Sequence, residues 1–126
     1  LAVIDPEVGT ARRGIAVRVK TEARVLVGPD NGLLWPAIDR LGGAVMAVDV
    51  SLSPFRLEPI SATFQGRDVF APVAAHIARG AGLAEAGDEI DLGSLVRLSP
   101  SEPSIGAGRV STMAFMGSLL PTSMQP

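Results

Sequence analysis

Cysteine is absent from this chain of 126 residues, and histidine occurs once, as His76. Without cysteine there are no disulfide bonds and no thiolate ligands, so we expect no metal site built within the chain. No apolar run reaches the roughly 18 residues that a membrane-spanning helix needs, and the first residues lack the pattern of a signal peptide. These absences predict a cytoplasmic protein that makes no contact with a membrane.

Charge of either sign is also sparse. The chain has 11 Lys and Arg residues against 13 Asp and Glu residues, a formal net charge of −2. The basic residues stand singly or in pairs, with Arg12 and Arg13 the densest spot, so no nucleic-acid partner is expected. The chain is rich in apolar residues, which make up 47% of it and predict a folded domain with a hydrophobic core.

The first 30 residues carry the alternation typical of strands. Leu1–Ile4 is an apolar run that predicts a buried strand, and Asp5–Pro6 would end it because proline has no N–H to donate. Residues 14–20 and 24–27 alternate apolar with polar side chains and predict a hairpin bridged by residues 21–23. Residues 5–12 would then form a loop at a strand end, where open α/β sheets place their ligand groups.

Helices are predicted further along the chain. A short helix over Leu34–Leu41 would be stopped by two glycines, and residues 44–50 read as a strand followed by an extended segment over Phe55–Ile60. The clearest helix is Asp68–Arg79, with Asp68 as its N-cap and Gly80 just beyond its end. Short strands interleaved with helices predict the α/β class, with a mixed central sheet flanked by helices.

Asp5 and Arg12 are the first candidates for chemistry, because they lie seven positions apart on one predicted loop. A carboxylate at a strand end could hold a small nucleophile, and a guanidinium could hold an anion or keep that carboxylate ionised. Spacing alone favours a plainer interpretation, a salt bridge that fixes the turn.

Two further segments have the composition of ligand loops. The turn cluster at residues 28–32 suggests a close backbone approach or positive φ angles, although a structural turn is favoured. The segment Ser61–Pro72 runs into a helix start, a natural anion site, although an ordinary capped turn is favoured there. His76 fits a packed or surface histidine, and Trp35 fits a core anchor better than a stacking surface for a base.

Three stretches, in this order, resemble the S-adenosylmethionine hydroxide adenosyltransferases, the family that includes fluorinase and chlorinase. They are VIDPEVGTARRGIAVR (3–18), VGPDNGLL (27–34) and SATFQGRDVFAPVAAHIARG (61–80). The resemblance implies that residues 1–108 are part of the family's N-terminal domain, that 109–126 form an irregular tail and that the C-terminal domain is missing. It further implies a homotrimer with the substrate bound between neighbouring subunits, and a chain that is inactive by itself.

The activity that the resemblance implies is hydrolysis of S-adenosylmethionine (SAM), in which water or hydroxide attacks the ribose C5′ carbon and releases adenosine and L-methionine. Asp5, Arg12 and Gln65 match the positions of the family's catalytic residues, and Phe64 and Gly66 would face the nucleophile. No cofactor or metal is implied, because SAM is the substrate.

Two departures from the family pattern leave other outcomes open. Gln65 stands where the hydrolytic members have histidine, and glutamine cannot take a proton. Four interpretations stay open: a slow hydrolase, a hydrolase in which Asp5 takes the proton, a halide-using enzyme that makes 5′-chloro-5′-deoxyadenosine, and a non-catalytic remnant. Glu7 stands where the family has glycine, and it would be strained by about 1 kcal/mol if the backbone there needs a positive φ.

Overall fold

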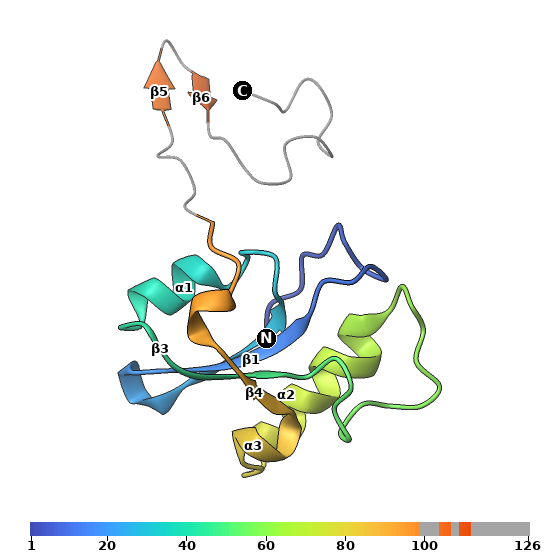
Figure 1. The fold of residues 1–126 in the computed structure, drawn as a ribbon. Helices are drawn as coiled ribbons and strands as arrows, with labels where there is room; N and C mark the ends of the chain where they lie inside the picture. Colours follow the sequence, from blue (N-terminus) through green and yellow to red (C-terminus); the bar gives the residue numbers. More distant parts are fainter. Residues whose placement is uncertain (99–103, 107–108, 112–126) are drawn as a thin grey trace.

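Four strands form the central sheet in the computed structural model, which describes residues 1–98, 104–106 and 109–111. They lie in the order β2–β1–β3–β4, and each pair of neighbours is antiparallel (Figure 1). Their bounds are β1 Gly14–Val19, β2 Val25–Pro29, β3 Ala44–Asp49 and β4 Asp88–Ile90. The predicted α/β class is confirmed, although these four strands contain no parallel pair that would make their sheet mixed.

Strands β1 and β2 are the predicted hairpin. Ile15 lies opposite Gly28, and the 3₁₀ turn η1 (Thr21–Ala23) joins the two strands. Strand β1 is central and is covered on both faces, so almost all of its side chains are buried. Strand β1 begins at Gly14, directly after the loop that carries Asp5 and Arg12. That loop therefore lies at one end of the sheet.

Helices cover both faces of the sheet and make two hydrophobic clusters (Figure 1). One face packs against the π-helical turn η2 (Gly66–Phe70), helix α2 (Ala71–Ala78) and helix α3 (Leu83–Ala86). Because side chains alternate along a strand, Ala16 faces this cluster while Ile15 points to the other face.

The second face packs against helix α1 (Trp35–Arg40), which confirms the predicted short helix. Ile38 of this helix is buried, and Trp35 packs against the same cluster as expected of a core anchor. The helix ends where Gly42 and Gly43 adopt φ of 89° and 94°, conformations that favour glycine.

The long helix begins earlier than predicted. Its first turn is η2, and Gln65 occupies the position before it, so the prediction that Asp68 is the N-cap is wrong. Asp68 instead lies inside the first turn with its carboxylate buried. The predicted end is confirmed, because Gly80 has φ of 110° and donates its N–H to the Ile77 carbonyl.

Two predicted extended segments are also wrong. Leu1–Ile4 is not a strand: a backbone hydrogen bond from Ala2 N to Val27 O joins it to β2, and Leu1 is 61% exposed. The physical reason is that this segment lies on the outer side of the edge strand β2, and no other strand of the described residues lies beside it. Phe55–Ile60 consists of turns and bends rather than extended chain, with a cis peptide bond between Glu58 and Pro59.

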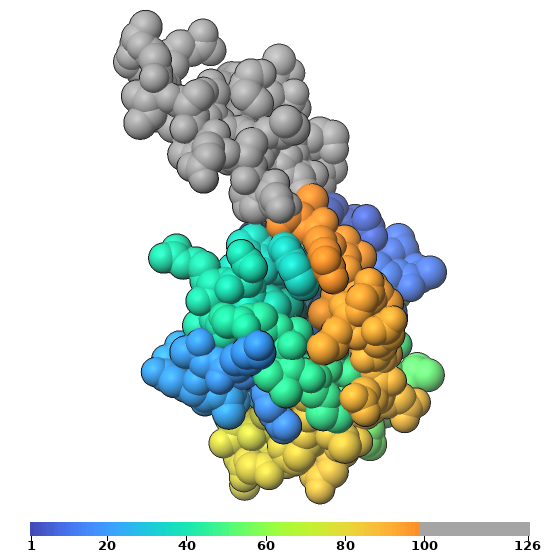
Figure 2. All heavy atoms as spheres, turned by 60° about the vertical axis from the view of Figure 1, so that its left-hand side comes forward, coloured from blue at the N-terminus to red at the C-terminus, as the bar shows by residue number. Residues whose placement is uncertain are grey.

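The chain after α3 crosses back over the molecule. Strand β4 joins the sheet edge, the 3₁₀ turn η3 (Leu92–Ser94) follows, and Leu95 is buried beside α1. Figure 2 shows residues 88–98, in orange, as a strip along the segments of α1 and β3. Within the described residues, no helix has the length and apolar character needed to cross a membrane.

Two short strands, β5 (Ser104–Gly106) and β6 (Arg109–Ser111), pair with each other. The predicted irregular tail therefore starts with a strand, and the rest of it, residues 112–126, lies outside the described residues. The division of the chain at residue 108 stays a prediction.

Candidate active site

The loop from Asp5 to Arg12 folds back on itself through local hydrogen bonds. Thr10 donates both its backbone N–H and its hydroxyl to the Glu7 carbonyl, at 3.0 and 2.6 Å. Gly9 turns the chain with φ of 82°, a conformation that glycine adopts without strain. Glu7 is not among the residues with positive φ, so the strain considered for this residue does not arise.

The fold brings Asp5 and Arg12 into direct contact. The Arg12 Nε–H donates to both carboxylate oxygens of Asp5, at 2.9 and 3.0 Å, and Nη2 donates to Oδ2 as well. Only 5% of the Arg12 side chain and 6% of the Asp5 side chain are exposed. Charge-assisted contacts of this forked type fix both the position and the plane of the two groups.

Gln65 joins this pair from a segment far along the chain. Its Oε1 atom accepts a hydrogen bond from Arg12 Nη2 at 2.5 Å. Because a guanidinium carries only donors, the atom that faces it must be the amide oxygen. The Nε2 group of Gln65 is thereby left to donate elsewhere, and Asp5, Arg12 and Gln65 form one polar cluster.

The ring of Phe70 packs against the Arg12 side of the cluster. The guanidinium carbon of Arg12 lies 5.3 Å from the centre of the buried Phe70 ring, a distance typical of a cation–π contact. Gly14 makes room for this ring, since a Cβ atom on Gly14 would lie 2.6 Å from Phe70 Cε1. Phe70 could not be assigned to the site from its pattern, because its place in the helix fits the apolar core equally well.

Asp68 anchors the loop that carries Gln65. Its Oδ2 atom accepts the Ser61 backbone N–H at 2.8 Å, and Arg67 Nε donates to its Oδ1 at 2.7 Å. The hydrogen bond from Arg67, followed by the one from Ser61, lowers the pKa of the Asp68 carboxyl. Asp68 in turn raises the pKa of Arg67. The carboxylate thus ties the start of residues 61–65 to the first helical turn.

Phe64 and Gly66 flank Gln65 without contacting the ion pair through side-chain hydrogen bonds. The Phe64 side chain stands at the surface, 58% exposed, and the Arg67 guanidinium lies 5.0 Å from its ring centre. Gly66 is half-buried, and a Cβ atom added there would lie 3.5 Å from Val3 Cγ1. Their assignment to the nucleophile pocket stays a prediction.

The turn cluster at residues 28–32 does make the close approach that its composition suggests. A Cβ atom on Gly28 would lie 2.3 Å from the Ala2 carbonyl oxygen, and Gly32 has φ of 91°. Asp30 and Asn31 are both buried in this turn. Sequence reasoning treated the turn only as backbone, and therefore missed the side-chain contacts that Asp30 and Asn31 make.

The remaining histidine lies outside the cluster. His76 is exposed on α2 and its ring stacks on Phe55, with 4.3 Å between ring centres, as expected of a packed or surface histidine. Among the residues that the structure describes, no group of three or more His, Asp or Glu side chains gathers where it could hold a metal ion.

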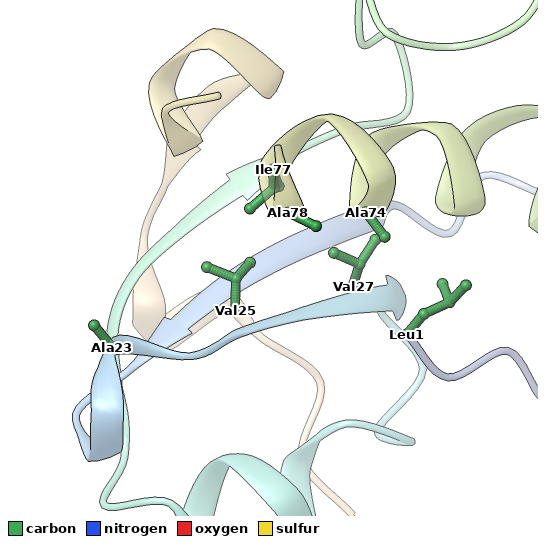
Figure 3. A pocket seen from close by; sticks show the side chains of 7 residues that line it. All are labelled: Leu1, Ala23, Val25, Val27, Ala74, Ile77 and Ala78. Atoms are coloured by element: carbon green, nitrogen blue, oxygen red, sulfur yellow. The ribbon is translucent and has the colours of Figure 1, made fainter. Parts of the chain in front are cut away.

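A pocket of about 250 Å³ lies between β2 and α2 (Figure 3). It is lined by alanine, valine, leucine and isoleucine side chains, with Val25 and Val27 on one side and Ala74 and Ile77 on the other. This lining offers no side-chain polar group that could hold or activate a reactant. This pocket therefore offers less for chemistry than the cluster of Asp5, Arg12 and Gln65 does.

Comparison with known proteins identifies relatives of the chain. A "(R)-S-adenosyl-L-methionine hydrolase" of Salinispora arenicola is 54% identical over 98 residues, which cover 78% of this chain and 37% of that protein. A fluorinase of an Actinoplanes species is 30% identical over an alignment, gaps included, of 129 positions that covers 83% of this chain and 42% of the fluorinase. The chain thus spans well under half the length of these two relatives.

A solved structure shares the fold. The crystal structure of an uncharacterized conserved protein from Thermotoga maritima superposes with a TM-score of 0.71 at 34% identity, covering 82% of this chain and 38% of that one. Residues 1–87 match the family described as "SAM hydroxide adenosyltransferase N-terminal domain". The match includes Asp5, Arg12 and Gln65. The chain therefore belongs to the SAM hydroxide adenosyltransferase family, as its three motifs indicated.

Proposed function

We propose that the protein to which this chain belongs is an S-adenosyl-L-methionine hydrolase. Water or hydroxide attacks the ribose C5′ carbon, an O–C5′ bond forms and the C5′–S bond breaks. The electron pair of the broken bond stays on sulfur, which leaves as the neutral thioether of L-methionine, and the ribose product is adenosine. Family membership supports this proposal, as does the name of the Salinispora relative.

The observation that carries the proposal is the contact of Asp5, Arg12 and Gln65. The sulfonium is already a good leaving group, so the protein has to hold and partly desolvate a nucleophile behind C5′. Asp5 offers oxygen acceptors for the protons of a water molecule, and Arg12 holds that carboxylate in place. Gln65, with its oxygen turned to Arg12, offers its N–H groups to a lone pair of the nucleophile.

The proton of the attacking water has one side-chain destination in this cluster. Arg12 has no acceptor atom and Gln65 cannot take a proton, so Asp5 or the solvent receives it. General base catalysis is typically worth about 10²–10⁴ in rate, and the side chain at position 65 supplies none of it here. We therefore propose slow turnover compared with a relative that has histidine at position 65.

Phe64 and Gly66 border the nucleophile in this proposal. Phe64 is exposed enough to contact a bound nucleoside, and Gly66 presents no hydroxyl to a halide ion. Water is therefore favoured over halide at this segment. We further propose that no cofactor or metal takes part, that the protein is cytoplasmic, and that it works as a homotrimer with SAM between neighbouring subunits, so that the 126 residues alone are inactive.

Halide transfer is the second candidate, because a fluorinase is among the relatives. Gln65 favours it in one respect: an amide N–H suits an anion, and an anion has no proton to lose. The lower identity of the fluorinase, 30% against 54% for the hydrolase, ranks it second. A chlorinase-like enzyme would make 5′-chloro-5′-deoxyadenosine in proportion to added chloride.

The test is a chromatographic assay of the protein expressed from its complete gene, with each sulfonium epimer of SAM, with and without chloride. We expect adenosine at equal rates in both buffers, and its loss in Asp5→Ala and Arg12→Ala. Glu22→Ala and Arg24→Ala are matched controls, because these residues form an ion pair exposed by 64% and 59% and should keep activity. A chloride-dependent nucleoside would instead establish the halide-using enzyme, and no product above background would indicate a non-catalytic remnant.

A further inference from the structure

We propose that Asn31 is a positioning residue that determines where Asp5 lies. It belongs to a turn, Asp30–Asn31, that is hydrogen-bonded to both ends of the loop carrying Asp5 and Arg12. The inference deepens the proposed function and rests on it. Asn31 lies outside the cluster of Asp5, Arg12 and Gln65. It acts through the backbone that leads into Asp5.

The Asn31 side chain is buried, with 8% of the residue exposed, and both ends of its amide are bound. Its Oδ1 accepts the Leu33 backbone N–H at 3.0 Å, and its Nδ2 donates to the Ile4 carbonyl oxygen at 2.9 Å. The orientation follows from the partners: an N–H can only meet the amide oxygen, and a carbonyl can only meet the amide nitrogen. The amide is therefore fixed with its donor on Ile4.

The Ile4 carbonyl belongs to the peptide bond that enters Asp5, so holding it fixes where the Asp5 side chain starts. On the other side of this peptide bond, the Val8 N–H donates to the Asp5 carbonyl at 3.3 Å and Arg12 holds the Asp5 carboxylate. Residues 1–4 form no strand, and their backbone link to β2 is the hydrogen bond from Ala2 N to Val27 O. The next residue after Asp5 is Pro6, which has no N–H to donate.

Asp30 fixes the other end of the same loop. Its backbone N–H donates to the Arg13 carbonyl at 2.8 Å, and its Oδ2 accepts from Arg13 Nη2 at 2.8 Å. Its Oδ1 accepts the Val96 N–H at 2.9 Å, which ties the turn to the body of the domain. One turn of two residues thus holds the residue before Asp5 and the residue after Arg12.

The glycines beside the turn make these hydrogen bonds to the loop sterically possible. At Gly28 a Cβ atom would lie 2.3 Å from the Ala2 carbonyl, so a larger residue would push the first residues away from β2. Gly32, with φ of 91°, turns the chain directly after Asn31. The sequence cluster at residues 28–32 therefore acts on the site through the position of Asp5 and Arg12.

Two substitutions separate positioning from simple turn formation. Asn31→Asp keeps the oxygen that accepts the Leu33 N–H, but places a second oxygen against the Ile4 carbonyl. Asn31→Ser keeps a short acceptor for the turn and cannot reach Ile4. Since misplacement by about 1 Å can lower turnover about 10²-fold, we expect kcat to fall by about 10–100-fold in both, with KM changed by less than about twofold.

The matched control is Ile38→Val, which loosens the buried core beneath α1 and touches no part of the loop. It should keep the wild-type kcat. A second readout does not depend on activity: the Arg12 Nε–H, held by both Asp5 oxygens, should give a slowly exchanging signal in ¹⁵N NMR spectra, assigned by its absence in Arg12→Lys. We expect its exchange with solvent to accelerate at least about tenfold in Asn31→Asp and Asn31→Ser, and to be unchanged in Ile38→Val.

The outcomes separate this inference from the proposed function. If the wild-type protein makes no adenosine while the Arg12 signal responds to Asn31, the proposed function fails and the positioning role stands. If both Asn31 variants keep the wild-type kcat and the wild-type exchange rate, Asn31 only forms a turn and the inference is overturned. Should Asn31→Asp fail to fold, Asn31→Ser alone decides, because it adds no charge.

Discussion

Asp5 and Arg12 should stabilise the folded protein as a strongly coupled pair. The perturbation is a double-mutant cycle made of Asp5→Ala, Arg12→Ala and the double variant. Each single substitution leaves a charged group whose side chain is about 95% buried without the partner that balances it, given exposed fractions of 6% and 5%. The double substitution removes both charges, so it should be little worse than either single one.

The magnitude follows from the geometry. Breaking a buried ion pair typically costs about 3–5 kcal/mol. The lower end applies here, because Glu7 and Ala11 on the same loop are exposed and the loop can relax toward water. We expect each single substitution to lower the free energy of unfolding by about 3 kcal/mol, with a coupling energy of about 2 kcal/mol between the two sites.

The assay is urea denaturation of the four proteins, monitored by the fluorescence of Trp35, with the exposed pair of Glu22 and Arg24 as the matched control cycle. The control pair is more than half exposed on both sides, so its coupling should stay below about 1 kcal/mol and fall further in salt. The Asp5–Arg12 coupling should persist in about 0.5 M salt, because salt screens a buried ion pair much less than an exposed one. Coupling below about 0.5 kcal/mol would refute the reasoning that this pair is a buried unit.

Three further predictions test other parts of the site. Gln65→His should raise kcat for adenosine formation at least about tenfold and add a dependence on pH near the ordinary imidazole pKa of about 6.5, because histidine can take a proton; an unchanged rate and a flat profile would count against the assignment of this position. Asp68→Asn removes a carboxyl whose pKa is lowered from the ordinary value of 3.8, first by Arg67 and then by the Ser61 N–H. The Asp68 carboxylate stabilises the fold fully above its unfolded pKa of 3.8, and this stabilisation is lost as the pH falls through the lower pKa of the folded state. Acid should therefore destabilise the variant less than the wild type below about pH 4. Equal acid sensitivity of the two proteins in thermal melts would contradict this. Gly28→Ala should lower the free energy of unfolding by about 1–3 kcal/mol, since its Cβ would lie 2.3 Å from Ala2 O, whereas Gly82→Ala, with its nearest contact at 3.9 Å, should be tolerated in the same denaturation assay.

Local patterns were sufficient to predict most of the regular structure. The hairpin at residues 14–27, the short helix before Gly42 and the end of the long helix at Gly80 follow from alternation and from glycine positions, which act over a few residues. The errors fall where a distant partner decides. Leu1–Ile4 has the composition of a buried strand, yet burial requires neighbours on both sides, and composition does not show them.

The site was predictable only in part for the same reason. Spacing suggested that Asp5 and Arg12 meet, because both lie on one loop. The contact of Gln65 with Arg12 joins residues 53 positions apart, and only the family resemblance pointed to it. Asn31 reaches Ile4 across 27 positions, and a turn-forming asparagine looks the same in sequence whether or not its amide also holds another segment.

The most direct measurement of the central claim is hydrolysis of SAM in ¹⁸O-labelled water by the protein expressed from its complete gene, with the products identified by mass spectrometry. Attack of water on C5′ predicts adenosine that carries a single ¹⁸O atom, in its 5′-hydroxyl group, together with unlabelled L-methionine, and the loss of both products in Asp5→Ala. Methylthioadenosine together with ¹⁸O-labelled homoserine, in place of adenosine and methionine, would contradict the proposed attack at C5′.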